Sequence, residues 1–359
     1  RFVRSAGAGQ RQRGVFGMRL CVGTAKGIVI LDPDRGATPL MVSADPPSVW
    51  CMAQDCAQPN LIYAGSVHNA QAGSARGKSS LAVSDDGGRI WRDITPGSAR
   101  DEEVWAIAAA PDRPGEVFIG TSHARIFRSE DSGHSFRECT AFLKLPGRDR
   151  WTFPQPPFIP HVRSLTFDPH NPNTLYVGVE EGGVFSSRDR GNTFEPLNQN
   201  ISADIHCVVV DPDDSNRLYA TTGRGFYFSP TRGAAWTLIK GMSRAYAVPL
   251  LLRRQAKGVI YTAAAAGPPP TWSIDERGAD ALMYRSSDGG LGFAPIASGD
   301  GTAYPTRGMV MRLIAQPDDH RILYGALSDG GIIRIDERAD TVAMIAEKLP
   351  PAYDLAILP

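Results

Sequence analysis

The chain has 359 residues and a formal net charge of zero, with 42% hydrophobic and 21% charged residues. These proportions are typical of a globular protein and exclude disorder of the whole chain. Because a protein that grips a polyanion through its overall charge carries a basic excess, we expect no nucleic-acid partner. No apolar run approaches the roughly 18 residues of a membrane span, so we expect no membrane insertion.

Residues 1–17 contain several arginines and no apolar segment, which indicates a flexible N-terminal tail rather than a secretory leader. The five cysteines are odd in number and form no C-x-x-C pair, so a cysteine zinc site is not expected. Both features favour the reducing environment of the cytoplasm. A leader cleaved ahead of Arg1 would leave the same sequence, and that alternative stays open.

A short motif, Ser-x-Asp-x-Gly-x-x-aromatic, recurs along the chain, and a fifth copy has Thr231 in place of the Asp. Its Asp and Ser side chains can hydrogen-bond backbone groups across a tight turn, while its Gly permits a positive φ. These local bonds explain the motif fully, so we assign it a structural role. The complete copies are Ser84, Asp86, Gly88 and Trp91; Ser129, Asp131, Gly133 and Phe136; Ser187, Asp189, Gly191 and Phe194; and Ser286, Asp288, Gly290 and Phe293.

A second signature, an aromatic residue inside an apolar run and often followed by small residues, precedes each motif. The shortest spacing, from Tyr219 to Tyr261, is 42 residues, which fits four short strands joined by tight turns. One unit predicts strands at 104–110, 117–120, 125–129 and 135–138. The aromatic positions are Tyr63, Phe118, Tyr176, Tyr219, Tyr261 and Tyr324.

Four-stranded antiparallel units repeated at this period predict a β-propeller. Six complete units begin near residues 49, 104, 162, 205, 247 and 310. The last segment, 352–359, predicts an inner strand without partners, and 18–45 supplies the three strands that it lacks. We therefore predict an all-β, seven-bladed propeller as a single domain over 18–359. Its ring would be closed by the C-terminal strand joining the N-terminal blade, with Leu355 beside Leu20.

The repeated motif resembles the Asp-box, or BNR, repeat, and the resemblance covers residues 18–359. It implies the propeller fold but no single function, because such propellers include sialidases, xyloglucan-active glycosidases, sortilin-type receptors and photosystem assembly factors. Sialidase activity would imply an Arg-Ile-Pro element in the first blade. Arg19-Leu-Cys stands there instead, and Phe158-Ile-Pro-His-Val-Arg163 is a poor substitute. The sequence therefore does not predict a typical sialidase.

Each blade has four strands, A to D from the centre outward, so its connections divide between two faces. The A–B turns and the motif turns share one face, and the D–A and B–C connections share the other. Insertions at 67–79, 145–160 and 263–282 all fall on the second, variable face. Because binding residues concentrate on variable loops held by a rigid frame, we expect the ligand at the channel mouth on this face.

Histidines on three successive blades could hold a divalent metal ion there, namely His68, His123 and His161, with Glu180 or Glu181 as a further ligand. His206 falls within an inner strand, and Asp204 is one of several further carboxylates on this face. A glycoside hydrolase needs two carboxylates, and the candidates on adjacent blades are Glu102 or Glu103 against Glu180 or Glu181.

Aromatic residues at the mouth, among them Trp50, Trp105 and Tyr353, could stack on a sugar or pack between blades. Our first hypothesis is a binding scaffold whose partner is a small ligand, a glycan or a protein. The alternative is an enzyme on the same face, either glycosidase-like or a metal-assisted hydrolase or lyase. The predicted ligand-binding residues are His68, His123, His161, Arg163, Arg224, Tyr246, Tyr304 and Arg307.

Overall fold

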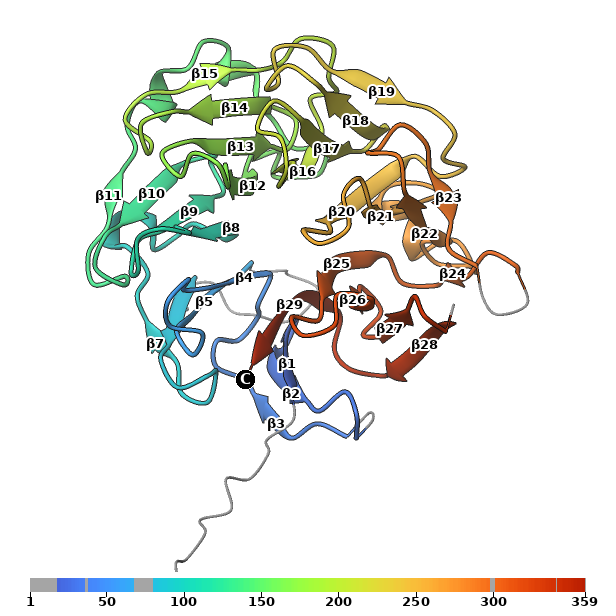
Figure 1. Ribbon diagram of the computed structural model, residues 1–359. Coiled ribbons are helices and arrows are strands. Elements are labelled where there is room, and N and C mark those ends of the chain that lie inside the picture. Colours follow the sequence, from blue (N-terminus) through green and yellow to red (C-terminus); the bar gives the residue numbers. More distant parts are fainter. Residues whose placement is uncertain (1–17, 36–37, 68–79, 298–300, 340, 359) are drawn as a thin grey trace, which may run out of the picture.

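The computed structural model describes residues 18–35, 38–67, 80–297, 301–339 and 341–358. Within these residues, seven antiparallel sheets are arranged as blades around a central channel (Figure 1). The predicted all-β, seven-bladed propeller is confirmed. Residues 1–17, for which we predicted a tail, lie outside the described part of the chain. The described residues contain no helix with the length and apolar character needed to cross a membrane.

Strands A to D follow one another from the channel outward in blades 2 to 7. Blade 2 contains β4 (Cys51–Gln54), β5 (Ile62–Gly65), β6 (Leu81–Ser84) and β7 (Arg92–Asp93). Blade 3 contains β8 (Val104–Ala109), β9 (Val117–Thr121), β10 (Ile126–Ser129) and β11 (Arg137–Glu138). Blade 4 contains β12 (Val162–Phe167), β13 (Leu175–Val179), β14 (Gly183–Ser187) and β15 (Glu195–Pro196).

Blade 5 contains β16 (Ile205–Val210), β17 (Leu218–Thr222), β18 (Gly225–Ser229) and β19 (Thr237–Ile239). Blade 6 contains β20 (Tyr246–Leu252), β21 (Ile260–Ala265), β22 (Ala281–Ser286) and β23 (Ala294–Pro295), with the short β24 (Pro305–Thr306) also paired to β22. Blade 7 contains β25 (Val310–Ala315), β26 (Ile322–Leu327), β27 (Ile332–Asp336) and β28 (Thr341–Ala346). Short helical turns are η2 (Gly97–Ala99), η3 (Phe142–Lys144), η4 (Arg148–Arg150) and α1 (Pro269–Trp272).

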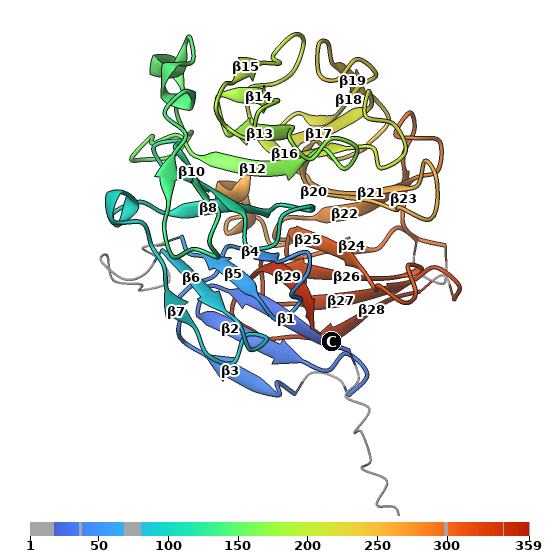
Figure 2. The same ribbon diagram turned by 60° about the vertical axis from the view of Figure 1, so that its left-hand side comes forward.

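Blade 1 joins the two ends of the chain. Its inner strand is the C-terminal β29 (Ala352–Leu358), followed outward by β1 (Arg19–Thr24), β2 (Gly27–Leu31) and β3 (Met41–Ser43). Both views show β29 alongside β1 (Figures 1 and 2). The predicted closure of the ring by the C-terminal strand is confirmed, but its register differs by two residues: Leu355 lies opposite Val22 rather than Leu20, and Leu20 lies opposite Ile357. The closing pair removes two free sheet edges at once.

Adjacent blades approach closely at a glycine at or near the end of strand B. A Cβ at Gly65 would lie 2.7 Å from Cγ1 of Val104, and one at Gly178 would lie 2.7 Å from Cγ2 of Ile205. Each glycine therefore makes room for a β-branched side chain at the start of the next blade's inner strand. The six aromatic residues that mark the strand-B signature are all buried in the sheets.

The repeated motifs form the turns between strands C and D. In blade 3, the backbone N–H of Gly133 donates to Ser129 Oγ at 2.9 Å, and the N–H of Ser135 donates to Asp131 Oδ1 at 2.9 Å. In blade 5, the hydroxyl of Thr231 replaces the carboxylate and accepts from the N–H of Ala235 at 3.2 Å. Strand D of blade 3 was predicted at 135–138 but begins only at Arg137, because Ser135 and Phe136 belong to the motif turn.

We predict that replacing Leu355 by Asp lowers the free energy of unfolding by about 3–5 kcal/mol, because a carboxylate would enter the buried closing blade. Leu355 is only 3% exposed, whereas Leu238 is 40% exposed and serves as the control. Leu238→Asp should change stability by less than about 1 kcal/mol. Urea unfolding measures both; equal losses in the two variants would contradict the role assigned to the closing pair.

We also predict a specific acid sensitivity of the motif turn in blade 3. Hydrogen bonds from Ser135 and Ser129 lower the pKa of Asp131 from 3.8 to about 2. A depressed pKa in the folded state stabilises the protein above the unfolded value and ceases to do so as pH falls through about 2. The stability difference between the protein and Asp131→Asn should therefore be constant above about pH 5 and shrink from pH 4 to pH 2.

Thermal unfolding across this pH range measures the Asp131 effect. Asp85→Asn is the matched control, because Asp85 is an exposed aspartate at the variable position between Ser84 and Asp86 of the blade 2 motif. A difference between the protein and Asp131→Asn that stays unchanged down to pH 2 would show that the carboxylate charge does not stabilise the turn.

Candidate functional site

A recurring β-bulge near the start of the inner strand directs one side chain toward the channel in five of the seven blades. In blade 3, Val104 pairs with Thr121 and Ala106 pairs with Gly120, so Trp105 has no partner across the ladder. A bulged residue re-aims its side chain and bends its strand. The residues in this position are Trp105, Arg163, His206, Met311 and Tyr353, and all five line the channel cavity of about 720 Å³.

Aromatic rings form one wall of the channel mouth, the end of the cavity bounded by Trp50, Trp105, Arg163, His206 and Tyr353. The ring of Trp50 lies 4.9 Å from that of Trp105 and 4.5 Å from that of Tyr353. On its other side, Trp105 stacks on His161 with centroids 3.8 Å apart. These contacts hold the rings rigidly, so the wall can receive a flat or apolar ligand at little cost in side-chain entropy.

Arg163 lies against this aromatic wall. Its guanidinium carbon is 4.7 Å from the centroid of Trp50 and 5.7 Å from that of Trp105. Its Nε lies 3.4 Å from Oε2 of Glu180. Among the described residues, no hydrogen bond engages the two terminal nitrogens, so these donors remain available to a ligand in the cavity.

Glu180 follows β13 directly and is buried beside the mouth. Its Oε2 lies 2.9 Å from Nε2 of His161. Burial would raise its pKa, but His161, His206 and Arg163 lower it to about 2, so Glu180 is ionised. Burial lowers the pKa of His161, and a neutral His161 that carries its proton on Nε2 donates that hydrogen bond to Glu180.

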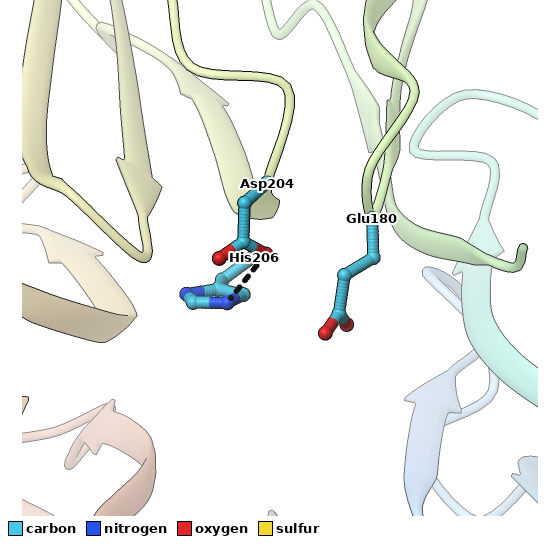
Figure 3. A group of neighbouring side chains, drawn as sticks. All are labelled: Glu180, Asp204 and His206. Carbon is cyan, nitrogen blue, oxygen red and sulfur yellow. Dashed lines mark ion pairs between the residues drawn. The ribbon is translucent and has the colours of Figure 1, made fainter. Parts of the chain in front are cut away.

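Asp204 and His206 come from the next blade and point into the same space as Glu180 (Figure 3). The ligand atoms of these three residues lie within 4.8 Å of one another. Nδ1 of His206 donates to the carbonyl oxygen of Ala247 at 2.6 Å, while Nε2 lies 3.2 Å from Oδ1 of Asp204. Burial disfavours the charged ring, but Asp204 outweighs burial and raises the pKa of His206.

Two neighbours define the edges of this group. A Cβ at Gly223 would overlap Oδ2 of Asp204, so the absence of a side chain there lets the carboxylate approach. Glu181 adopts a left-handed φ of 55° directly after Glu180 and is half-buried. Burial and the nearby Asp204 raise the pKa of Glu181, so it stays protonated to a higher pH than an exposed glutamate does.

The structure places the two other predicted catalytic carboxylates in protein contacts. Glu102 is buried, pairs with Arg125 and accepts a hydrogen bond from the hydroxyl of Thr121. Glu103 accepts from Nε1 of Trp105 at 3.1 Å, which orients that ring at the mouth. None of the four predicted catalytic carboxylates lines the channel cavity.

The remaining predicted residues are dispersed. His68 lies outside the described residues. His123 is exposed and lines a separate surface hollow with Leu143 and Arg148. Within the described chain, the only group with metal-ligand spacing is Glu180, Asp204 and His206, so His123 and His161 do not form one there. Of the predicted ligand-binding residues that the structure describes, only Arg163 lines the cavity. His161 and Tyr246 pack against the lining residues Trp105 and His206, whereas Arg224, Tyr304 and Arg307 do not line the cavity.

The sequence contains a signal for the channel-facing positions that we did not use. A β-branched residue begins each of four inner strands at Val104, Val162, Ile205 and Val310, and the bulged residue follows it immediately. The residue after that β-branched position varies from blade to blade. This variation on a repeated frame identifies His206 and Met311, which we had not predicted as ligand-binding residues.

No protein-family model matches the chain. Over 208 residues it is 23% identical to the xyloglucanase Xgh74A of Acetivibrio thermocellus. That alignment covers 50% of this chain and 25% of the enzyme, so the chain spans only a quarter of the length of that relative.

Solved structures of similar fold include both enzymes and a binding protein. The GH74 enzyme of Niastella koreensis aligns with a TM-score of 0.65 at 18% identity, over 92% of this chain and 52% of that one. YCF48, in a structure bound to D1 peptide, aligns with a TM-score of 0.57 at 16% identity, over 88% of each chain. At these identities the likeness establishes the propeller fold alone.

From these contacts we predict that Glu102→Gln lowers the free energy of unfolding by about 1–3 kcal/mol, because Arg125 would lose a charged partner in a largely buried position. Glu103→Gln is the matched control, since an amide oxygen can still accept from Trp105, and it should cost less than about 1 kcal/mol. Chemical denaturation measures both variants. Equal stability of Glu102→Gln and the unmodified protein would leave Glu102 free for a role in catalysis.

Proposed function

We propose that this protein is a binding propeller that holds a glycan, a peptide or another small ligand at the channel mouth on the variable face. The observation that carries the proposal is the set of bulged side chains around the cavity of about 720 Å³. Five of the seven blades contribute one differing residue each at the same position of a rigid frame, which is how repeat proteins build a specific site. The cavity volume falls in the range of ligand pockets.

The chemistry of the mouth supports a ligand with a flat face and a polar or anionic group. Trp50, Trp105 and Tyr353 offer rings, and Arg163 offers terminal donors beside them. Sugar rings and peptide side chains both match this combination. The similarity to a peptide-bound YCF48 structure and to xyloglucanases agrees with these two ligand classes.

The experiment is a titration followed by tryptophan fluorescence, because Trp50 and Trp105 form the wall itself. The probes are xyloglucan oligosaccharides and a peptide library. We predict that at least one class changes the emission and that Trp105→Ala and Arg163→Gln each weaken its binding about tenfold, or about 1.4 kcal/mol. The controls are Trp272→Ala and Arg224→Gln, which alter residues outside the cavity wall. Binding that is unchanged by Trp105→Ala and Arg163→Gln would contradict the proposal.

A second candidate function is glycoside hydrolysis, favoured by the opposite pKa shifts of two adjacent carboxylates. Glu180 is held ionised, while the raised pKa of Glu181 suits a general acid. The similarity to a xyloglucanase is in keeping with this chemistry. Release of reducing sugar from xyloglucan, abolished by Glu181→Gln but retained by Glu103→Gln, would establish hydrolysis; binding without release would favour the scaffold.

A further inference from the structure

Glu180, Asp204 and His206 form a compact group where blades 4 and 5 meet (Figure 3). Glu180 and His206 are at least nine-tenths buried, and Asp204 is half-buried. The guanidinium of Arg163 offsets the charge of Glu180. Asp204 and His206 lie in the same group, with the ligand atoms of all three residues within 4.8 Å of one another, and a second carboxylate there is costly to bury unless a positive charge lies beside it.

The orientation of His206 shows where that charge would lie. The carbonyl oxygen of Ala247 can only accept a hydrogen bond, so Nδ1 of His206 must carry the proton that it donates there. The other ring nitrogen, Nε2, then faces Oδ1 of Asp204 at 3.2 Å. Neither of these two buried atoms makes a hydrogen bond within the described residues. In a neutral ring, two lone pairs would face each other, so a positive charge, either a metal ion or a proton on Nε2, lies between them.

Neighbouring groups fix the orientation of His206 and Glu180 by hydrogen bonds and ion pairs, as is usual for metal ligands. The backbone carbonyl of Ala247 fixes the tautomer of His206, and His161 and Arg163 orient Glu180 from behind. Hydrogen bonds of this kind, made to the metal-binding side chains by their neighbours, set the orientation and basicity of metal ligands. The absence of a side chain at Gly223 leaves room for the carboxylate of Asp204.

We propose that Glu180, Asp204 and His206 bind one divalent transition-metal ion, with the ion bridging Nε2 of His206 and Oδ1 of Asp204. One imidazole nitrogen with two carboxylates suits Zn²⁺ or Mn²⁺, whereas Mg²⁺ and Ca²⁺ prefer oxygen ligands alone. His206 lines the channel cavity, so the open coordination positions of the ion would face the mouth. This site stands independently of the proposed function, because metal can bind whether or not the mouth holds an organic ligand.

A proton on Nε2 is the competing cation, and it would make His206 and Asp204 a simple ion pair. The two cases differ in a measurable way, because a proton leaves no place for a metal ion between the same atoms. Binding of Mn²⁺ or Zn²⁺ that depends on both residues therefore decides between them.

The test is calorimetric titration of the full chain with MnCl₂ and, separately, ZnCl₂, after dialysis against a chelator. We expect one equivalent of metal, and we expect His206→Gln and Asp204→Asn each to weaken binding at least tenfold. His123→Gln is the matched control, because this exposed histidine lies outside the group and should leave the affinity unchanged.

Circular dichroism establishes that each variant is folded. Should His206→Gln fail to fold, Asp204→Asn retains the shape of the side chain and carries the test alone. MgCl₂ is the control for non-specific divalent binding and should give no stoichiometric heat. No stoichiometric binding of either transition metal, or equal affinity in the protein and Asp204→Asn, would overturn the site and leave a proton between His206 and Asp204.

Discussion

The pairing of β29 with β1 is the constraint on which the rest of the propeller depends. Without it, the ring would have two open edges, and the inner strands would have no fixed distance from one another. The closing blade packs on both sides, with Leu20 and Leu355 in the cluster shared with blade 7, and Cys21 and Leu358 in the cluster shared with blade 2. Closure thus sets the diameter of the channel and the spacing of every side chain that faces it.

The two faces of the ring divide structure from chemistry. On one face, the motif turns satisfy their own backbone groups and leave little for a ligand to contact. On the other, the inner strands begin with a bulge that turns Trp105, Arg163 and His206 toward a common space. The frame repeats while the presented residue changes, so each blade can alter the site without altering the fold.

The fold could be predicted from the sequence because each repeat contains the residues that form its turn and the aromatic residue that is buried in its sheet. The site could be predicted only in part. Arg163 and Glu180 were predicted on the correct face, but His206 was assigned to an inner strand, where regular alternation gives no reason to expect it at the mouth. Only the bulge, a break in register set by pairing between strands, places it beside Asp204. His123 was also predicted on the variable face, but its side chain is exposed and lines a separate surface hollow. The position of a residue on one face of a blade does not fix the direction in which its side chain points.

The order of strands in blade 1 has a consequence for synthesis on the ribosome. Among the described strands β1 is made first and its partner β29 last, so the apolar edge formed by Leu20 and Val22 stays unpaired until the strands between them have been translated. During that interval the nascent propeller is an open arc that chaperones could shield. A chain that terminates before β29 would lack the inner strand of blade 1.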